Sequence, residues 1–176
     1  MNYLIFICCL CTVHALSHTG QSDLSCHDDN CVTMPENCAH VGSTTQCLAM
    51  FTFNVTEHDT QLRLTGHIDT NQYVAVGLSE DVLMGDDLVM DCYAGESSTV
   101  DAQFSFNKRR GVNEILSNQS LPGIHLEGST RMNGQVMCQW LWTDEVIVND
   151  QNFEKSSTDF HILLAVGSFK KNGQGM

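Results

Sequence analysis

Short runs of alternating apolar and polar residues follow one another along most of the chain, separated by Gly, Asn, Asp and Ser. Alternation with a period of two is typical of half-buried β-strands, and no stretch shows the period of an amphipathic helix. The strands expected from this pattern cover 47–55, 61–68, 72–79, 87–93, 99–106, 135–143 and 159–167. The pattern predicts an all-β fold, an antiparallel β-sandwich with an immunoglobulin-like plan.

The N-terminal end of the chain has a different pattern. An uninterrupted apolar run covers 3–13, which is too short to cross a membrane but has the length of a signal-peptide core. Small residues follow this run, so that we expect a signal peptide over 1–17, cleaved after Ala15 or Ser17. No later stretch is long and apolar enough to span a membrane. The sequence therefore predicts a secreted, extracellular protein.

Six cysteines remain once the expected signal peptide is removed, and an even number in a secreted chain predicts disulfides. They are Cys26, Cys31, Cys38, Cys47, Cys92 and Cys138. The first four crowd together, which predicts two disulfides within a short, irregular, disulfide-rich N-terminal cap over 18–46. The third disulfide is expected between Cys92 and Cys138. The sandwich domain is then expected over 47–168, followed by a flexible tail over 169–176.

Charge and short motifs narrow the possible partners. The formal net charge is -13, from 21 acidic and 8 basic residues, so that nucleic acid and anionic membrane surfaces would be repelled. Sequons at Asn54 and Asn118 fit a glycosylated extracellular surface. No serine-nucleophile, zinc-protease or phosphate-loop motif is present, so that no independent catalytic site is expected. The adjacent Asp86 and Asp87 are expected to be solvated turn residues, with a calcium ion as the alternative.

His161 is the histidine whose context suggests a function. It interrupts an apolar strand, and alternation places it on the same face as Leu163 and Ala165. A neutral imidazole on that face needs a partner, which is either a hydrogen-bonding group of the core or a metal. The rival histidine, His125, is expected in a loop, where solvent satisfies it.

Met84 is the second residue of interest, because it lies in a turn between two predicted strands. One face of the strand before this turn offers Ala75 and Gly77, which leaves room for a flat group. A thioether and an imidazole facing each other across an apolar slot suit haem iron, and Met/His ligation favours electron transfer. Met84 and His161 are therefore the candidate metal ligands, and the alternative is that both are ordinary structural residues.

Several segments resemble DOMON domains, especially those of animal ferric-chelate reductase-like proteins. The most specific of them is YVAVGLSEDVLMGDDLVMDC at 73–92, which contains the MGDD element. The cysteine spacing at 26–38, the strand GQVMCQW at 134–140 and the strand DFHILLAVG at 159–167 also resemble the family. Together these segments extend over nearly all of the expected mature chain.

The resemblance implies a β-sandwich that holds a b-type haem between a turn methionine and a late-strand histidine, which would be Met84 and His161 here. It also implies a transmembrane cytochrome as redox partner. Haem-free members of the superfamily make a second function possible, in which the domain binds a glycan or a membrane-protein partner. A third is an accessory to a copper-dependent monooxygenase, although the chain has no histidine cluster for copper.

Overall fold

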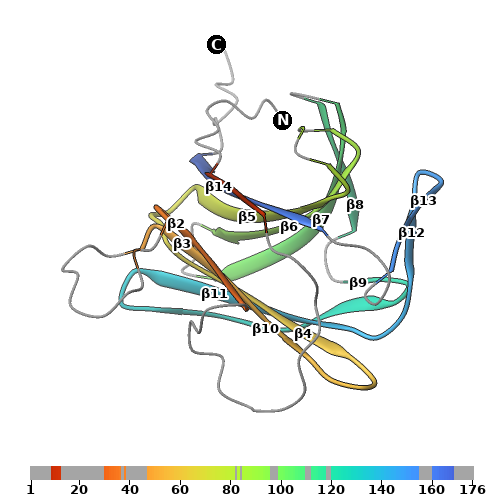
Figure 1. Cartoon of the computed structure of the whole chain (residues 1–176). Helices are drawn as coiled ribbons and strands as arrows, with labels where there is room; N and C mark the ends of the chain where they lie inside the picture. Colours follow the sequence, from red (N-terminus) through yellow and green to blue (C-terminus); the bar gives the residue numbers. More distant parts are fainter. Residues whose placement is uncertain are drawn as a thin grey trace, which may run out of the picture.

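The computed structural model describes residues 9–12, 30–36, 38, 47–81, 83, 85–95, 99–109, 112–117, 120–154 and 160–168. These residues form β-strands and the turns between them, and no helix is found among them. Accordingly, none of these ranges contains a helix able to cross a membrane. The antiparallel β-sandwich predicted from the sequence is confirmed, because two six-stranded sheets lie as two layers (Figure 1).

The strands of the first sheet pair antiparallel in the order β1-β14-β5-β6-β7-β8. Their bounds are β1 Cys9–Thr12, β14 His161–Ser168, β5 Gln72–Ser79, β6 Asp87–Ala94, β7 Val100–Arg109 and β8 Val112–Ser117. Strand β1 falls within the segment expected to be a signal peptide and pairs with β14. Cleavage after Ala15 or Ser17 stays a prediction, because both residues lie outside the described part of the chain.

The second sheet has the order β2-β3-β4-β11-β10-β9 and is also antiparallel. Its strands are β2 Cys31–Met34, β3 Ala49–Val55, β4 Thr60–His67, β11 Gln135–Trp142, β10 Ile124–Met132 and β9 Ser120–Leu121. A separate hairpin of β12 Val146–Val148 and β13 Gln151–Phe153 projects to one side of the sandwich (Figure 1).

All seven predicted strands are present, and the structure adds strands that the pattern did not predict. Strand β2 lies inside the expected irregular cap, so that this part of the cap is an edge strand of the second sheet. The expectation of a loop around His125 is wrong, because His125 lies in β10 and pairs with Leu141. Its side chain is exposed, as expected. Strand β10 is mostly exposed and therefore lacks the alternation that marks a buried face, whereas β2 and β12 contain buried residues but are only four and three residues long.

Apolar side chains fill the space between the two sheets. Alternate residues of β5 and β6 point inward, because successive residues of a strand face opposite sides of the sheet. The largest fully buried side chains are Trp140, Trp142, Phe51, Phe104, Phe106 and Phe153. Trp140 packs its edge against Phe104 across the layers, with ring centroids 6.5 Å apart. Since every second residue of a strand points into this inner core, the residues between them face outward from the first sheet.

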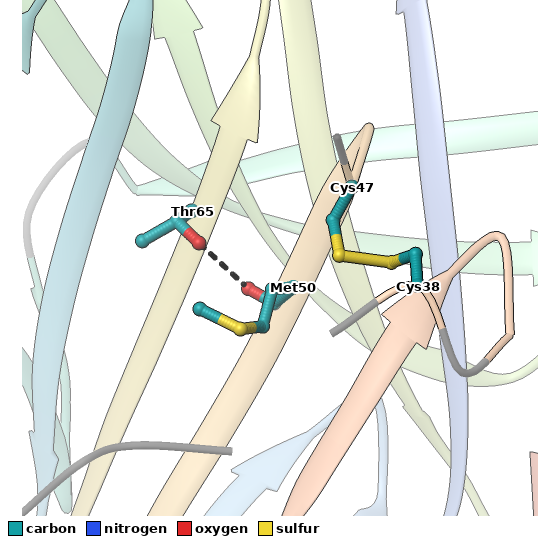
Figure 2. Close-up of a disulfide and its surroundings, with 4 residues drawn as sticks. All are labelled: Cys38, Cys47, Met50 and Thr65. Atoms are coloured by element: carbon teal, nitrogen blue, oxygen red, sulfur yellow. Dashed lines mark hydrogen bonds between the residues drawn. A yellow bond between two sulfur atoms is a disulfide. The ribbon is translucent and has the colours of Figure 1, made fainter. Parts of the chain in front are cut away.

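Two disulfides with both cysteines in the described part of the chain reinforce the sandwich. Cys92 of β6 is bonded to Cys138 of β11, so that this disulfide joins the two sheets inside the core, as expected from the sequence. Cys38, after β2, is bonded to Cys47, which precedes β3 (Figure 2). Cys31 is also disulfide-bonded, whereas Cys26 lies outside the described residues.

Candidate functional site

The face of the first sheet that points away from the inner core is called the outer face below. Four consecutive strands contribute to it, and the register aligns their side chains in rows across the sheet. Its members are His161, Leu163 and Ala165 of β14, Tyr73, Ala75, Gly77 and Ser79 of β5, Asp87, Val89, Asp91 and Tyr93 of β6, and Gln103, Ser105 and Asn107 of β7. Most of these side chains are buried although they do not face the inner core.

His161 begins β14 and lies half-buried at one end of the outer face. Its Cα partners are Ser79 on β5 and Thr12 on β1, and Thr12 belongs to the segment expected to be cleaved. Among the described residues, the Nδ1 atom of His161 is buried and has no hydrogen-bond partner. Because burying a polar nitrogen without a partner costs free energy, such an atom requires an explanation. Within that part of the chain, the hydrogen-bonding core group expected as one possible partner of the imidazole is not found at Nδ1.

Small apolar residues lie beside His161 on the same face. Leu163 pairs with Gly77, and Ala165 pairs with Ala75, so that the expected sharing of one face by these residues is confirmed. A Cβ atom added at Gly77 would lie 3.4 Å from the Cβ of Leu163, an ordinary van der Waals contact. Gly77, Ala75 and Ala165 thus form a strip of small residues beside His161 on the outer face.

The turn that contains Met84 starts and ends beside His161. Ser79, the last residue of β5, is the pairing partner of His161, and Asp87 opens β6 in the same row on the next strand. The structure therefore brings the two ends of this turn and His161 to one end of the outer face. Met84 itself lies outside the described residues.

Asp87 corrects the expectation that the adjacent aspartates are solvated turn residues. Asp86 is exposed, but Asp87 is buried, because it is the first residue of β6 and points to the outer face. Its Oδ2 atom accepts hydrogen bonds from Asn107 Nδ2 at 3.2 Å and from the Gly85 amide at 3.0 Å. Burial raises the pKa of Asp87, an effect that the hydrogen bonds from Ser79, Asn107 and Gly85 partly offset.

Asp91 is a second buried carboxyl group on the outer face, and the sequence reasoning missed it. Its Oδ2 atom accepts hydrogen bonds from Gln103 Nε2 at 3.1 Å and from Ser105 Oγ at 3.0 Å. Burial raises the pKa of Asp91 to about 6, and these two hydrogen bonds lower it only in part. Burial also raises the pKa of the neighbouring Tyr93, with the charges of Asp101 and Asp91 as the smaller causes.

The other predicted site residues lie away from the outer face. Asn54 is half-buried on β3 in the second sheet, and Asn118 falls outside the described residues, so that glycosylation at either stays a prediction. Across the described ranges, no three His, Cys, Asp or Glu side chains come together as ligands of a bare metal ion.

Comparison with known proteins gives matches at the level of the domain. No family model matches the chain. The chain is 28% identical over 148 residues to the "Putative ferric-chelate reductase 1 homolog" of Drosophila melanogaster, covering 83% of this chain and 22% of that protein. It is 25% identical over 138 residues to the "Putative ferric-chelate reductase 1" of Danio rerio, covering 78% of this chain and 23% of that protein. The chain thus spans less than a quarter of the length of these relatives.

A solved structure shares the fold. The cytochrome domain of Myriococcum thermophilum cellobiose dehydrogenase aligns with a TM-score of 0.53 and 9% sequence identity, over 71% of this chain and 64% of that one. At this identity the likeness concerns the fold alone. The resemblance of the sequence segments agrees with the names of the relatives. The two-layered antiparallel sandwich agrees with the fold of the solved structure. Together these findings support a DOMON-type domain.

Proposed function

We propose that this domain binds a b-type haem on the outer face of the first sheet, with His161 and Met84 as axial ligands, and serves in electron transfer. The observation that carries the proposal is the position of His161 at the end of the strip formed by Gly77, Ala75 and Ala165 on the outer face. Among the described residues its Nδ1 atom has no hydrogen-bond partner, so that no core hydrogen bond through this atom accounts for the histidine. A neutral imidazole would ligate iron through one of its two ring nitrogens. Relatives named ferric-chelate reductase and a fold neighbour described as a cytochrome domain support the redox assignment.

The residues of this chain would hold the cofactor and exclude water from it. His161 would supply the stronger axial ligand, and the small residues of β5 and β14 would leave space for the plane of the macrocycle. With both axial positions filled by side chains, haem iron exchanges electrons and has no open position for a substrate. The domain would then be an electron-transfer component, with no catalytic site of its own.

The proposed setting is extracellular, with a membrane cytochrome or another redox protein as partner. Disulfides inside the fold support an oxidising compartment, as do the predicted signal peptide and sequons. The relatives are more than four times as long as the matched segment, so that their further parts are candidates for the partner function. An extracellular ferric complex is a suitable electron acceptor for such a system.

The experiment is to load the purified domain with haem and record absorption spectra before and after reduction. We expect the sharp visible bands of a low-spin, six-coordinate b-type haem in the reduced protein. A protein that stays colourless with ample haem would contradict the proposal and favour the haem-free module that binds a glycan or a membrane protein.

Methionine substitutions test the second ligand. Met84→Ala should give a five-coordinate or water-bound iron with a lower reduction potential, because a thioether ligand favours the ferrous state. Met90 lies fully buried in the inner core, and Met137 is half-buried on β11, so that both serve as controls. Met90→Ala and Met137→Ala should reduce stability and leave the spectrum unchanged. A spectrum that is indifferent to Met84→Ala would remove Met84 from the ligand set.

A further inference from the structure

The turn between β5 and β6 is held at both of its ends by buried or half-buried side chains of the first sheet. We infer that Asp87, assisted by Asn107, is a positioning residue that fixes this turn and with it the methionine ligand. The inference rests on the proposed haem-binding function, because Met84 matters only if it ligates iron. Asp87 itself would touch neither the cofactor nor the iron.

The residues that follow Met84 are tied directly to β6 and β7. The Gly85 amide donates to Asp87 Oδ2 at 3.0 Å, and the Asp86 amide donates to the carbonyl oxygen of Asn107. Asn107 Nδ2 in turn donates to the same Asp87 oxygen at 3.2 Å. One carboxylate oxygen thus connects the turn backbone to a side chain of the neighbouring strand.

The residue that precedes Met84 is tied to the other end of the turn. The Leu83 amide donates to Asp81 Oδ1 at 2.6 Å, and the Asp81 amide donates to Ser79 Oγ at 3.3 Å. The hydroxyl group of Ser79 also reaches the carbonyl oxygen of Leu83 at 3.5 Å and hydrogen-bonds Asp87. Both chain neighbours of Met84 are therefore fixed relative to Ser79, the pairing partner of His161.

The backbone of the turn has a conformation that needs such support. Gly85 has a φ angle of 147° and Asp86 a φ angle of 61°, and both values are unfavourable for most side-chain-bearing residues. Without the carboxylate of Asp87, the Gly85 amide would lose its acceptor and the turn could relax to other conformations. A Met84 side chain carried on a relaxed turn would spend less time at ligand distance from the iron.

Asp91 provides a matched control for Asp87. Both aspartates lie on β6, both point to the outer face, both are buried, and each accepts a hydrogen bond from a side chain of β7. The hydrogen bonds of Asp91 come from Gln103 and Ser105, which are strand residues, so that its carboxylate holds no turn. A general loss of packing on this face should follow from either substitution, whereas loss of turn positioning should follow only from changing Asp87.

The first measurement uses the haem-free domain and follows amide hydrogen exchange by NMR. Asp87→Ala should accelerate exchange of the Gly85 and Asp86 amides at least about tenfold, whereas Asp91→Ala should leave them unchanged. Asp87→Asn keeps an acceptor oxygen and should restore most of the protection. Unchanged exchange in Asp87→Ala, or equal acceleration in both alanine variants, would overturn the anchoring role.

The second measurement uses the haem-loaded protein. Asp87→Ala should shift the reduced spectrum toward five-coordinate iron and lower the reduction potential, as Met84→Ala does, while Asp91→Ala and Asp87→Asn keep the wild-type spectrum. A wild-type spectrum and potential in Asp87→Ala would overturn the inference and leave haem binding standing. If the wild-type protein binds no haem, the proposed function fails and the inference falls with it, whatever the amide exchange shows about the turn.

Discussion

The two faces of the first sheet are both buried, yet they are built from different chemistry. On the inner face, Leu88, Met90 and Cys92 of β6 alternate with the outer-face residues and pack into an apolar core. On the outer face, Asp87 and Asp91 of the same strand are equally inaccessible to solvent. Burial of carboxyl groups opposes folding unless other interactions offset it, whereas burial of apolar groups favours it.

This contrast separates the part of the sheet that stabilises the fold from the part that is available for function. The inner face is held by packing and by one disulfide across the layers, and Nε1 of Trp140 is a buried donor there without a partner among the described residues. Among the same residues, Nδ1 of His161 and Oδ1 of Asp87 are buried on the outer face without hydrogen-bond partners. The outer face differs from the inner one in that it also buries the carboxyl groups of Asp87 and Asp91, and the predictions below test whether it serves a cofactor.

Removing the disulfide of the inner core should have the largest effect on stability. Replacing Cys92 and Cys138 by Ala opens a loop with a sequence separation of 46 residues. The chain-entropy relation gives a loss of about 4 kcal/mol in the free energy of unfolding. Urea titration measures the loss, and haem bound per folded molecule should not change. A loss below about 1 kcal/mol would mean that the inner face does not carry the stability assigned to it.

Asp91 should make the stability of the domain depend on pH. Its pKa in the folded state is about 6, above the ordinary value of 3.8, so that the folded state binds the proton more tightly than the unfolded chain. This contribution is fully present below pH 3.8 and is lost as the pH rises through about 6. The difference of roughly two pKa units corresponds to about 3 kcal/mol.

Substitution of Asp91 by Asn should remove that pH dependence. Asn keeps an acceptor oxygen for Gln103 and Ser105 and carries no charge, so that the variant should be more stable than the wild type at pH 7 and similar to it at pH 3.8. Urea titrations of both proteins across this window measure the difference. If the free energy of unfolding of the two proteins had the same pH dependence, the pKa of Asp91 would not differ between the folded and unfolded states.

Filling the strip beside His161 should have a smaller effect that is confined to the cofactor. Gly77→Val adds a β-branched side chain that suits a strand and first meets Leu163 at van der Waals distance. We expect haem affinity to fall at least about tenfold, or about 1.4 kcal/mol, with little change in the free energy of unfolding. Haem titration and urea titration of the same variant separate the two quantities. Unchanged affinity would place the cofactor elsewhere.

The sequence predicted the inner face well, because alternation directly reports burial against one core. It also placed His161, Leu163 and Ala165 on one face of their strand, and Ala75 and Gly77 on one face of theirs. The pairing of Leu163 with Gly77 and of Ala165 with Ala75 was added by the structure. Strand β10 was missed for a physical reason. In β10 most side chains are exposed, so that its position is set by pairing with β11 and not by its own hydrophobic pattern.

The buried aspartates of the outer face were harder to predict. Two adjacent aspartates such as Asp86 and Asp87 are typical of solvated turns. Here β6 begins at Asp87, so that the carboxylate of Asp86 is exposed and that of Asp87 is buried. A signal was present in DLVMDCY, where alternation puts Asp87 and Asp91 on the side opposite Leu88. Their burial depends on β7, whose Gln103 and Asn107 side chains supply the hydrogen bonds, and strand pairing of this kind does not follow from local pattern.

The central claim, that His161 holds a haem on the outer face, is tested most directly by the absorption spectrum of His161→Ala after haem loading. The account predicts that this variant folds and loses most of the bound haem, since the stronger ligand is gone. His125→Ala, which changes an exposed histidine of β10, should keep the wild-type spectrum. A His161→Ala protein with wild-type haem content and an unchanged six-coordinate spectrum would contradict the account.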